Sequence, residues 1–263
     1  MRIAQPSTIL GYLPLYIMQG NEIITYDTAQ KAIEAINIGE CDISIGDPFM
    51  MNYIDYEKKN IIIIAGFSNK VFHSVLTFDP FISIKNMKGK TIVSYPEPST
   101  SFFLAKKLKK EFALGKILET PFNTELSPLL TQEADLAIVL EPNATSALKN
   151  GARMLKDFSN TKAVMTGLCT TKNFYEKNKK EIEEFLKQLK TSIKDFLSDD
   201  NILQKAGKYF PLHDKEVLAD AIERLRKEDI YCENLKFTDE EIIKGLELRN
   251  INMNVEEAKR YIL

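Results

Sequence analysis

Short apolar runs alternate along the chain with longer segments that place apolar side chains at helical spacing. The first apolar runs cover residues 2–4, 22–26, 43–45 and 61–64, the last being four isoleucines. The solid isoleucine run is typical of a strand at the centre of a parallel sheet. Helical spacing occupies residues 9–19 and 28–38, and each segment ends at a glycine, which commonly stops a helix. This alternation predicts an open α/β sheet.

The alternation starts again beyond a polar turn at residues 85–90, which follows an alternating, aromatic strand at 71–78. Strands are then expected at residues 91–93, 117–120, 133–142 and 163–170, with helices at 102–112, 124–131 and 143–149. The remainder has helical spacing almost throughout, over residues 177–197, 201–209, 215–226 and 238–248. Thr238 and Glu241 form the sequence pattern of a capping box at the start of the last of these helices.

Two short motifs occur twice in the same order. Pro-Ser-Thr closes the first strand at residues 6–8 and recurs at 98–100, while acid-x-Asp, an apolar run and acid-Pro span 40–48 and recur at 133–142. The copies are separated by nearly one constant offset, which predicts two lobes of similar topology. Lobe one is expected to comprise residues 1–82 and 172–263, and lobe two, inserted in it, residues 83–171. Crossings near residues 78–90 and 163–172 would form a hinge.

The composition narrows the class of protein. The chain has 263 residues, of which 44% are hydrophobic, so a sizeable core can form. A net charge of −2 disfavours a nucleic-acid groove or a membrane-surface patch, and no apolar stretch approaches transmembrane length. The three cysteines lie far apart without a zinc-ligand spacing, so buried thiols are expected. No catalytic residue, metal site or cofactor is expected.

The two Pro-Ser-Thr tips carry the most informative polar groups. A Ser or Thr at a helix start can cap the helix, and the free backbone N–H groups there attract anions. Strand ends in open α/β sheets are also where ligands bind. The tips therefore predict a site for an anionic or acceptor group, with ordinary helix capping as the alternative.

Further candidates lie at the ends of other strands. Asp47 and Glu141 can accept hydrogen bonds from ligand donors, or they can simply cap the helices that follow. His73 lies in an apolar strand, where a satisfied, half-buried imidazole is the alternative to a ligand contact. Aromatic residues near the tips can stack on a flat ligand or pack in the core. The expected ligand-binding set is Ser7, Thr8, Tyr12, Asp47, His73, Ser74, Tyr95, Ser99, Thr100, Ser101, Glu141, Asn143 and Thr166.

Four segments carry a resemblance to a known family. They are residues 36–45, Lys88-Gly-Lys-Thr-Ile-Val93, residues 133–142 with Gly151, and residues 173–186. The chain resembles the substrate-binding proteins of ABC importers, in the branch that handles sulfonates, nitrate and thiamine-precursor pyrimidines. The resemblance implies a two-lobed type II periplasmic-binding-protein fold, with open mixed sheets flanked by helices. It also implies a monomer that closes on a small organic solute and, if exported, hands it to an ABC permease and its ATPase.

Location and activity have alternatives at this stage. The protein is expected to be periplasmic or at the cell surface if a leader has been removed, and cytoplasmic otherwise. Chorismate dehydratase and the fungal thiamine-pyrimidine synthase are enzymes on the same fold. The cysteine-rich motif of the synthase is absent and no general acid/base pair stands out, so the solute-binding function is preferred. A sensing domain would need a fused output domain. Genomic neighbours would separate these alternatives.

Overall fold

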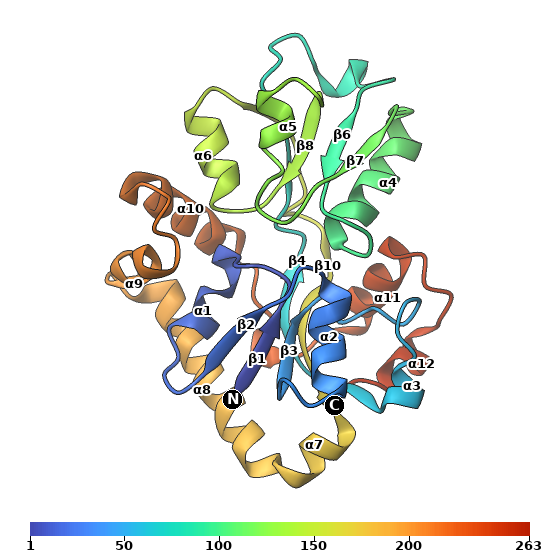
Figure 1. Cartoon of the computed structure of the whole chain (residues 1–263), viewed down its shortest axis with the longest axis vertical. Coiled ribbons are helices and arrows are strands. Elements are labelled where there is room, and N and C mark those ends of the chain that lie inside the picture. Colours follow the sequence, from blue (N-terminus) through green and yellow to red (C-terminus); the bar gives the residue numbers. More distant parts are fainter.

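A computed structural model describes residues 1–263 and shows two lobes, each built on a five-stranded mixed sheet (Figure 1). In the first sheet the strand order is β2-β1-β3-β10-β4. These strands are β1 (Arg2–Gln5), β2 (Glu22–Thr25), β3 (Ile43–Gly46), β4 (Ile61–Lys70) and β10 (Lys162–Thr171). β1 pairs in parallel with β2 and β3, whereas β10 is antiparallel to β3 and β4.

The second sheet has the order β7-β6-β8-β5-β9 and repeats the pattern of the first. Its strands are β5 (Ser74–Thr77), β6 (Ile92–Ser94), β7 (Ile117–Glu119), β8 (Leu136–Val139) and β9 (Arg153–Asp157). β6 is parallel to β7 and β8, and β5 is antiparallel to β8 and β9. The repeated motifs therefore end equivalent strands, β1 with β6 and β3 with β8, and the predicted similarity of topology is confirmed.

The strand pairing places the crossings between the sheets differently from the sequence expectation. β5 belongs to the second sheet and β10 to the first, so the chain crosses at residues 71–73 and 158–161. The expected boundaries at 82/83 and 171/172 had placed β5 in lobe one and β10 in lobe two, so both assignments are wrong. A strand's own hydrophobic pattern shows that it is buried but does not show which sheet it joins. The expected hinge segments are replaced by two shorter ones.

Helices cover both sheets. In lobe one they are η1 (Leu10–Tyr12), α1 (Leu13–Tyr16), α2 (Ala29–Asn37), α3 (Tyr56–Lys59), α7 (Lys172–Lys177), α8 (Lys179–Ser198), α9 (Ile202–Tyr209), α10 (Lys215–Glu228), η3 (Glu233–Leu235), α11 (Asp239–Leu248) and α12 (Val255–Lys259). In lobe two they are η2 (Ile84–Asn86), α4 (Thr100–Phe112), α5 (Ser127–Leu130) and α6 (Asn143–Lys149). The predicted capping box of Thr238 and Glu241 is confirmed at the start of α11. No helix combines the length and the apolar character needed to cross a membrane.

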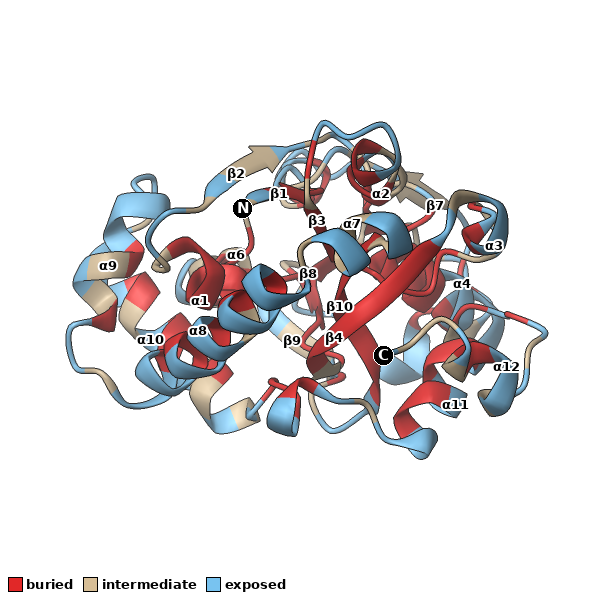
Figure 2. Ribbon diagram, turned by 90° about the horizontal axis from the view of Figure 1, so that it is seen from below, coloured by how far each residue is buried: buried red, intermediate tan, exposed pale blue.

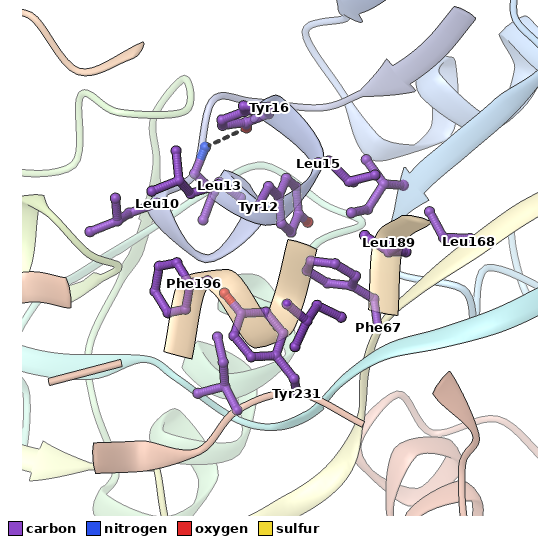
Figure 3. Packing of buried hydrophobic residues seen from close by; sticks show 14 of the residues in the cluster. Leu10, Tyr12, Leu13, Leu15, Tyr16, Phe67, Leu168, Leu189, Phe196 and Tyr231 are labelled. Atoms are coloured by element: carbon purple, nitrogen blue, oxygen red, sulfur yellow. Dashed lines mark hydrogen bonds between the residues drawn. The ribbon is translucent and has the colours of Figure 1, made fainter. Parts of the chain in front are cut away.

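The largest apolar cluster lies between the first sheet and the helices α1, α8 and α10. Figure 3 shows its centre, where Leu10 and Leu13 lie across from Phe196 and Tyr231. Seen from the side of α8, the buried strands β4 and β10 run through the middle of the molecule and the outer faces of the helices are exposed (Figure 2). All three cysteines are buried free thiols, as predicted.

Candidate ligand-binding site

A cavity lies where the two lobes and the crossing at residues 71–73 meet. Its volume is about 50 Å³, which leaves room for only a few water-sized groups. The lining residues are Pro6, Ile9, Tyr12, Ala29, Asp47, Phe72, His73, Tyr95, Ser99, Thr100, Ser101, Phe122, Leu140, Met165 and Thr166. Eight of the expected site residues are among them, namely Tyr12, Asp47, His73, Tyr95, Ser99, Thr100, Ser101 and Thr166. The structure thus brings residues from both repeated tips to one cavity, and their contacts with a ligand stay a prediction.

One wall of the cavity is the N-terminal turn of α4. Ser99 caps this helix by accepting a hydrogen bond from the Phe102 N–H at 3.1 Å. The Ser101 hydroxyl accepts one from the Tyr95 N–H at 3.3 Å. The backbone N–H groups of Thr100 and Ser101 bond to no protein acceptor. Two free donors and the positive end of a 13-residue helix therefore face the cavity, which favours an anion or an acceptor group.

Arg249 is a charged residue of this region that the sequence reasoning missed. Its side chain is fully buried, and its Nε lies 2.7 and 2.9 Å from the two carboxylate oxygens of Asp47. Its Nη2 is 3.4 Å from the Thr100 hydroxyl, so the guanidinium joins the two lobes. Asp47 also accepts the Phe49 N–H at 2.9 Å. Asp47 was expected to accept donors from a ligand; in the structure its carboxylate binds Arg249, and its contact with a ligand stays a prediction.

The position of Arg249 follows from the close packing of α11 on β10. A Cβ atom on Gly245 would lie 2.9 Å from Val164 and 3.1 Å from Phe49, so only glycine lets the helix approach this closely. The Arg249 guanidinium then lies 5.8 Å from the centre of the Phe49 ring. A sequence signal existed, because Arg249 continues the buried stripe of Ile242 and Leu246 at helical spacing. An arginine on such a stripe needs a buried partner.

His73 is a buried polar side chain of the cavity that makes no hydrogen bond with the protein. It is 4% exposed, and its Nδ1 is buried without a hydrogen bond. Burial, and then the nearby charge of Arg249, lower the pKa of His73 to about 3, so the imidazole is neutral. Buried polar groups are nearly always hydrogen-bonded. The satisfied imidazole considered from the sequence is therefore not what the structure shows, and a ligand group would complete the site.

An aromatic wall closes the lobe-two side of the cavity. The rings of Tyr95 and Phe122 lie 4.4 Å apart at an angle of 38°. Behind them Glu125 is completely buried, which raises the pKa of its carboxyl, and one of its oxygens has no partner. Its other oxygen accepts from the Asn143 amide at 2.9 Å. Asn143 thus supports Glu125 and does not line the cavity, contrary to expectation.

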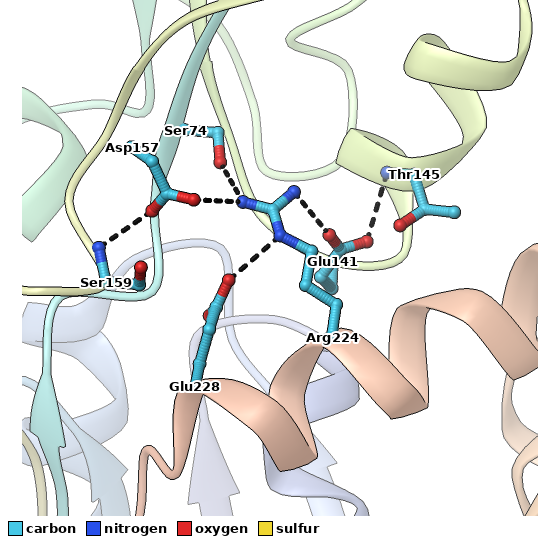
Figure 4. A network of polar contacts seen from close by, with 7 residues as sticks. All are labelled: Ser74, Glu141, Thr145, Asp157, Ser159, Arg224 and Glu228. Atoms are coloured by element: carbon cyan, nitrogen blue, oxygen red, sulfur yellow. Dashed lines mark hydrogen bonds and ion pairs between the residues drawn. The ribbon is translucent and has the colours of Figure 1, made fainter.

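The remaining expected residues also lie outside the cavity. The Ser7 hydroxyl accepts a hydrogen bond from Asn123 of lobe two at 3.0 Å, and Thr8 lies beside it. Glu141 accepts the Thr145 N–H within α6, as the capping alternative anticipated. Ser74 and Glu141 both bond to Arg224 of α10 (Figure 4). These four residues hold the lobes together around the cavity instead of lining it.

Nothing in the site is arranged for a metal ion, because no group of three or more His, Cys, Asp or Glu side chains converges. The polar groups that do converge are backbone N–H donors, hydroxyls, one neutral imidazole and the Asp47 carboxylate, which pairs with Arg249. Such a set can bind and orient a small solute through hydrogen bonds.

Solved structures share this fold. The periplasmic aliphatic sulphonate binding protein SsuA of Escherichia coli superposes with a TM-score of 0.69 at 16% identity, covering 85% of this chain and 78% of that chain. The alkanesulfonate-binding SsuA of Xanthomonas axonopodis, bound to MOPS, gives 0.73 at 11% identity over 100% and 97%. The periplasmic nitrate-binding protein NrtA of Synechocystis gives 0.66 at 10% identity over 83% and 68%. The two-lobed fold of periplasmic binding proteins is thereby confirmed.

Comparison with curated proteins finds no match. The sequence model of the family described as NMT1/THI5 like matches residues 22–201, which is more than half of the chain. The matched range contains the hinge crossings and most of the cavity wall. The chain belongs to the NMT1/THI5-like family.

Proposed function

We propose that this protein captures a small organic solute in the cavity between its lobes and delivers it to an ABC-type importer. The observation that carries the proposal is the unpartnered imidazole of His73, which faces a cavity that both lobes enclose. The similar structures described as sulphonate-binding, nitrate-binding and alkanesulfonate-binding support a transport role over catalysis. Two of them are periplasmic, and we extend an extracytoplasmic location and ABC permease and ATPase partners to this chain.

The donors in the cavity suit a solute with an oxygen-rich, anionic or acceptor end. The backbone N–H groups of Thr100 and Ser101 donate no hydrogen bond to the protein, and both residues line the cavity at a helix N-terminus. Arg249 adds positive potential, although Asp47 balances most of its charge. A flat or apolar part of the solute would rest on the rings of Tyr95 and Phe122. Sulfonates, carboxylates and pyrimidines all offer such a combination.

Solute entry requires the lobes to separate. A cavity of about 50 Å³ holds only a few atoms, so a solute of ordinary size enters only when the lobes are apart. The crossings at residues 71–73 and 158–161 are short and join the same pair of sheets, which suits a hinge. Solute binding should therefore reduce the radius of gyration measured by small-angle X-ray scattering.

Binding can be tested with a panel of solutes in isothermal titration calorimetry. The panel should hold alkanesulfonates, taurine, nitrate, small carboxylates and a hydroxymethylpyrimidine. In a His73→Phe variant the ring volume is kept while the hydrogen-bonding atoms are lost, so the affinity should fall about 10-fold or more. His213→Phe is the matched control, because His213 is the other histidine and lies outside the cavity.

Two results would overturn the proposal. One is a lack of binding by every solute class, and the other is an unchanged affinity in the His73→Phe variant. Mass spectrometry of the recovered solute adds a check, since a binding protein returns it unaltered and an enzyme on this fold would not.

A further inference from the structure

Outside the cavity, one arginine at the boundary between the lobes pairs with three carboxylates. The Arg224 cluster comprises Arg224 and Glu228 of α10 in lobe one, and Glu141 and Asp157 of lobe two (Figure 4). The guanidinium lies 2.9 Å from Glu141, 3.0 Å from Asp157 and 2.9 Å from Glu228. All three of its nitrogen atoms are thus paired, and two of the three acids belong to the opposite lobe.

The cluster is part of a longer charged stripe on α10. Glu216, Asp220, Arg224 and Glu228 recur every four residues, so they lie on one face of the helix. Lys149 of α6 pairs with Asp220 at 2.8 Å and with Glu216 at 3.2 Å. This face of α10 therefore touches lobe two at both ends, and separating the lobes there breaks four ion pairs.

The Arg224 cluster is directly connected to the cavity. Arg224 also donates to the Ser74 hydroxyl at 2.7 Å, and the residue before Ser74 is the cavity-lining His73. Likewise, Leu140 lines the cavity while the next residue, Glu141, enters the cluster. The same two backbone segments thus present one side chain to the solute and the next to Arg224. A change in the cluster necessarily acts on the cavity wall.

The charges in the cluster do not balance. One guanidinium faces three carboxylates, and the side chains are 20% exposed for Arg224, 4% for Glu141 and 11% for Glu228. The ammonium group of Lys70 lies nearby but donates its hydrogen bond to the backbone carbonyl of Glu228, at 2.6 Å. Lys70 therefore forms no ion pair with the three carboxylates. Two negative charges in excess repel one another across the lobe boundary, and a bound proton removes one of them.

We propose that the Arg224 cluster is a latch that takes up a proton when the lobes close, so that acidic conditions hold the cavity shut around its solute. The latch regulates the cavity described above, and its effect on uptake rests on the proposed function. Opening moves Asp157 and Glu141 away from α10 but leaves Glu228 with Arg224 on the same helix. The interlobe repulsion is therefore present only in the closed form, and protonation of Glu228 removes it.

The direction of the pH dependence follows from the closed structure. Burial, together with the charges of Asp157 and Glu141, raises the pKa of Glu228 to about 7 against the opposing charge of Arg224. In the open form the acids are distant, and the pKa returns toward its ordinary value of about 4.3. Protons then favour the closed form. The proton-linked stabilisation of the closed form is complete below the pKa that Glu228 has in the open form, and it is lost as the pH rises through about 7.

The latch can be tested without a solute by measuring the distance between the lobes. Spin labels at Lys31→Cys on α2 and Lys107→Cys on α4 report the separation, because both side chains are exposed and lie in different lobes. From about pH 8.5 to about pH 5.5 the ratio of closed to open molecules should rise by up to about 30-fold, the limit for one linked proton with these pKa values.

Substitutions in the Arg224 cluster test whether it causes the pH-dependent change in the distance between the lobes. Glu228→Gln keeps the shape and carries no charge, so its distance distribution should be closed and independent of pH. Arg224→Gln should be more open at every pH. Glu223→Gln is the matched control, since Glu223 is an exposed acid of α10 that pairs with Arg226 of the same helix and takes no part in the Arg224 cluster.

The latch is refuted if the parent shows no pH response, or if Glu228→Gln keeps the parental response. Circular dichroism of each variant confirms that α10 is still folded. Because no solute is present, the outcome is separate from that of the solute panel. The pH response can therefore be measured even if the protein binds none of the solutes in the panel.

Discussion

Replacing Arg249 by methionine should destabilise the protein strongly. The substitution removes the guanidinium but retains most of the apolar side-chain volume, and it leaves the Asp47 carboxylate buried without its partner. The two side chains are 0% and 5% exposed, so water cannot replace the lost hydrogen bonds. Removing one member of a buried pair typically costs about 3–5 kcal/mol, and we expect a loss of that size.

The cause of the loss can be isolated by a double-mutant cycle. Asp47→Asn with Arg249→Met removes both charges, so the double variant should be more stable than Arg249→Met alone by at least about 1–2 kcal/mol. The free energy of unfolding is measured by urea titration monitored by circular dichroism. The imidazole of His73 is an independent reporter. Burial and Arg249 lower its pKa to about 3, so its NMR titration should move to higher pH without Arg249.

A loss of less than about 1 kcal/mol in the Arg249→Met variant, or additive effects of the two substitutions, would contradict this prediction. Either result would mean that Asp47 is hydrated or finds another donor. A shift of the His73 pKa without a loss of stability would show that Arg249 acts only through its charge.

Three further predictions concern other buried groups of the fold. Gly245→Ala should destabilise the fold by about 1–3 kcal/mol in thermal unfolding, since its methyl group would collide with Val164. Glu125→Gln should flatten the pH dependence of the free energy of unfolding. Burial raises the pKa of Glu125 in the folded protein, so the parent loses stability as the pH rises above about 4.3, the pKa of a glutamate in the unfolded chain. The variant has no such group and should not lose stability in this range. Ser192→Ala should cost about 1 kcal/mol in urea titration, because the buried Ser192 hydroxyl donates to the Pro14 carbonyl at 2.6 Å.

The parts of the structure that the sequence predicted are those governed by local patterns. The four isoleucines of β4, the repeated strand tips and the capping box at Thr238 each carry their signal within a few residues. The grouping of Thr100 with Asp47 at one cavity also followed, because ligands bind at the carboxyl ends of strands in open α/β sheets and these residues end equivalent strands of the two sheets.

What the sequence did not predict depends on partners far along the chain. Cross-strand packing decides which sheet β5 and β10 each join, and the sequence of a single strand does not reveal that packing. Arg249 reaches Asp47 from 202 residues away. Glu141 was expected to bind a ligand, but Arg224 on α10 competes for the same carboxylate. A buried acid at a strand end indicates that a hydrogen-bond donor must lie beside it. Only the folded structure shows which residue or ligand supplies that donor.

The insertion of lobe two between β4 and β10 of lobe one has a consequence for how the chain is made. Lobe two is one continuous piece from β5 to β9, whereas β10 lies between β3 and β4 in the first sheet. A chain emerging from the ribosome therefore exposes all strands of lobe two before the central strand of lobe one exists. Until then the ten residues of β4, with their isoleucines, have no sheet to join. Nascent chains that end before residue 162 should hold a folded second lobe beside an unpaired, aggregation-prone strand.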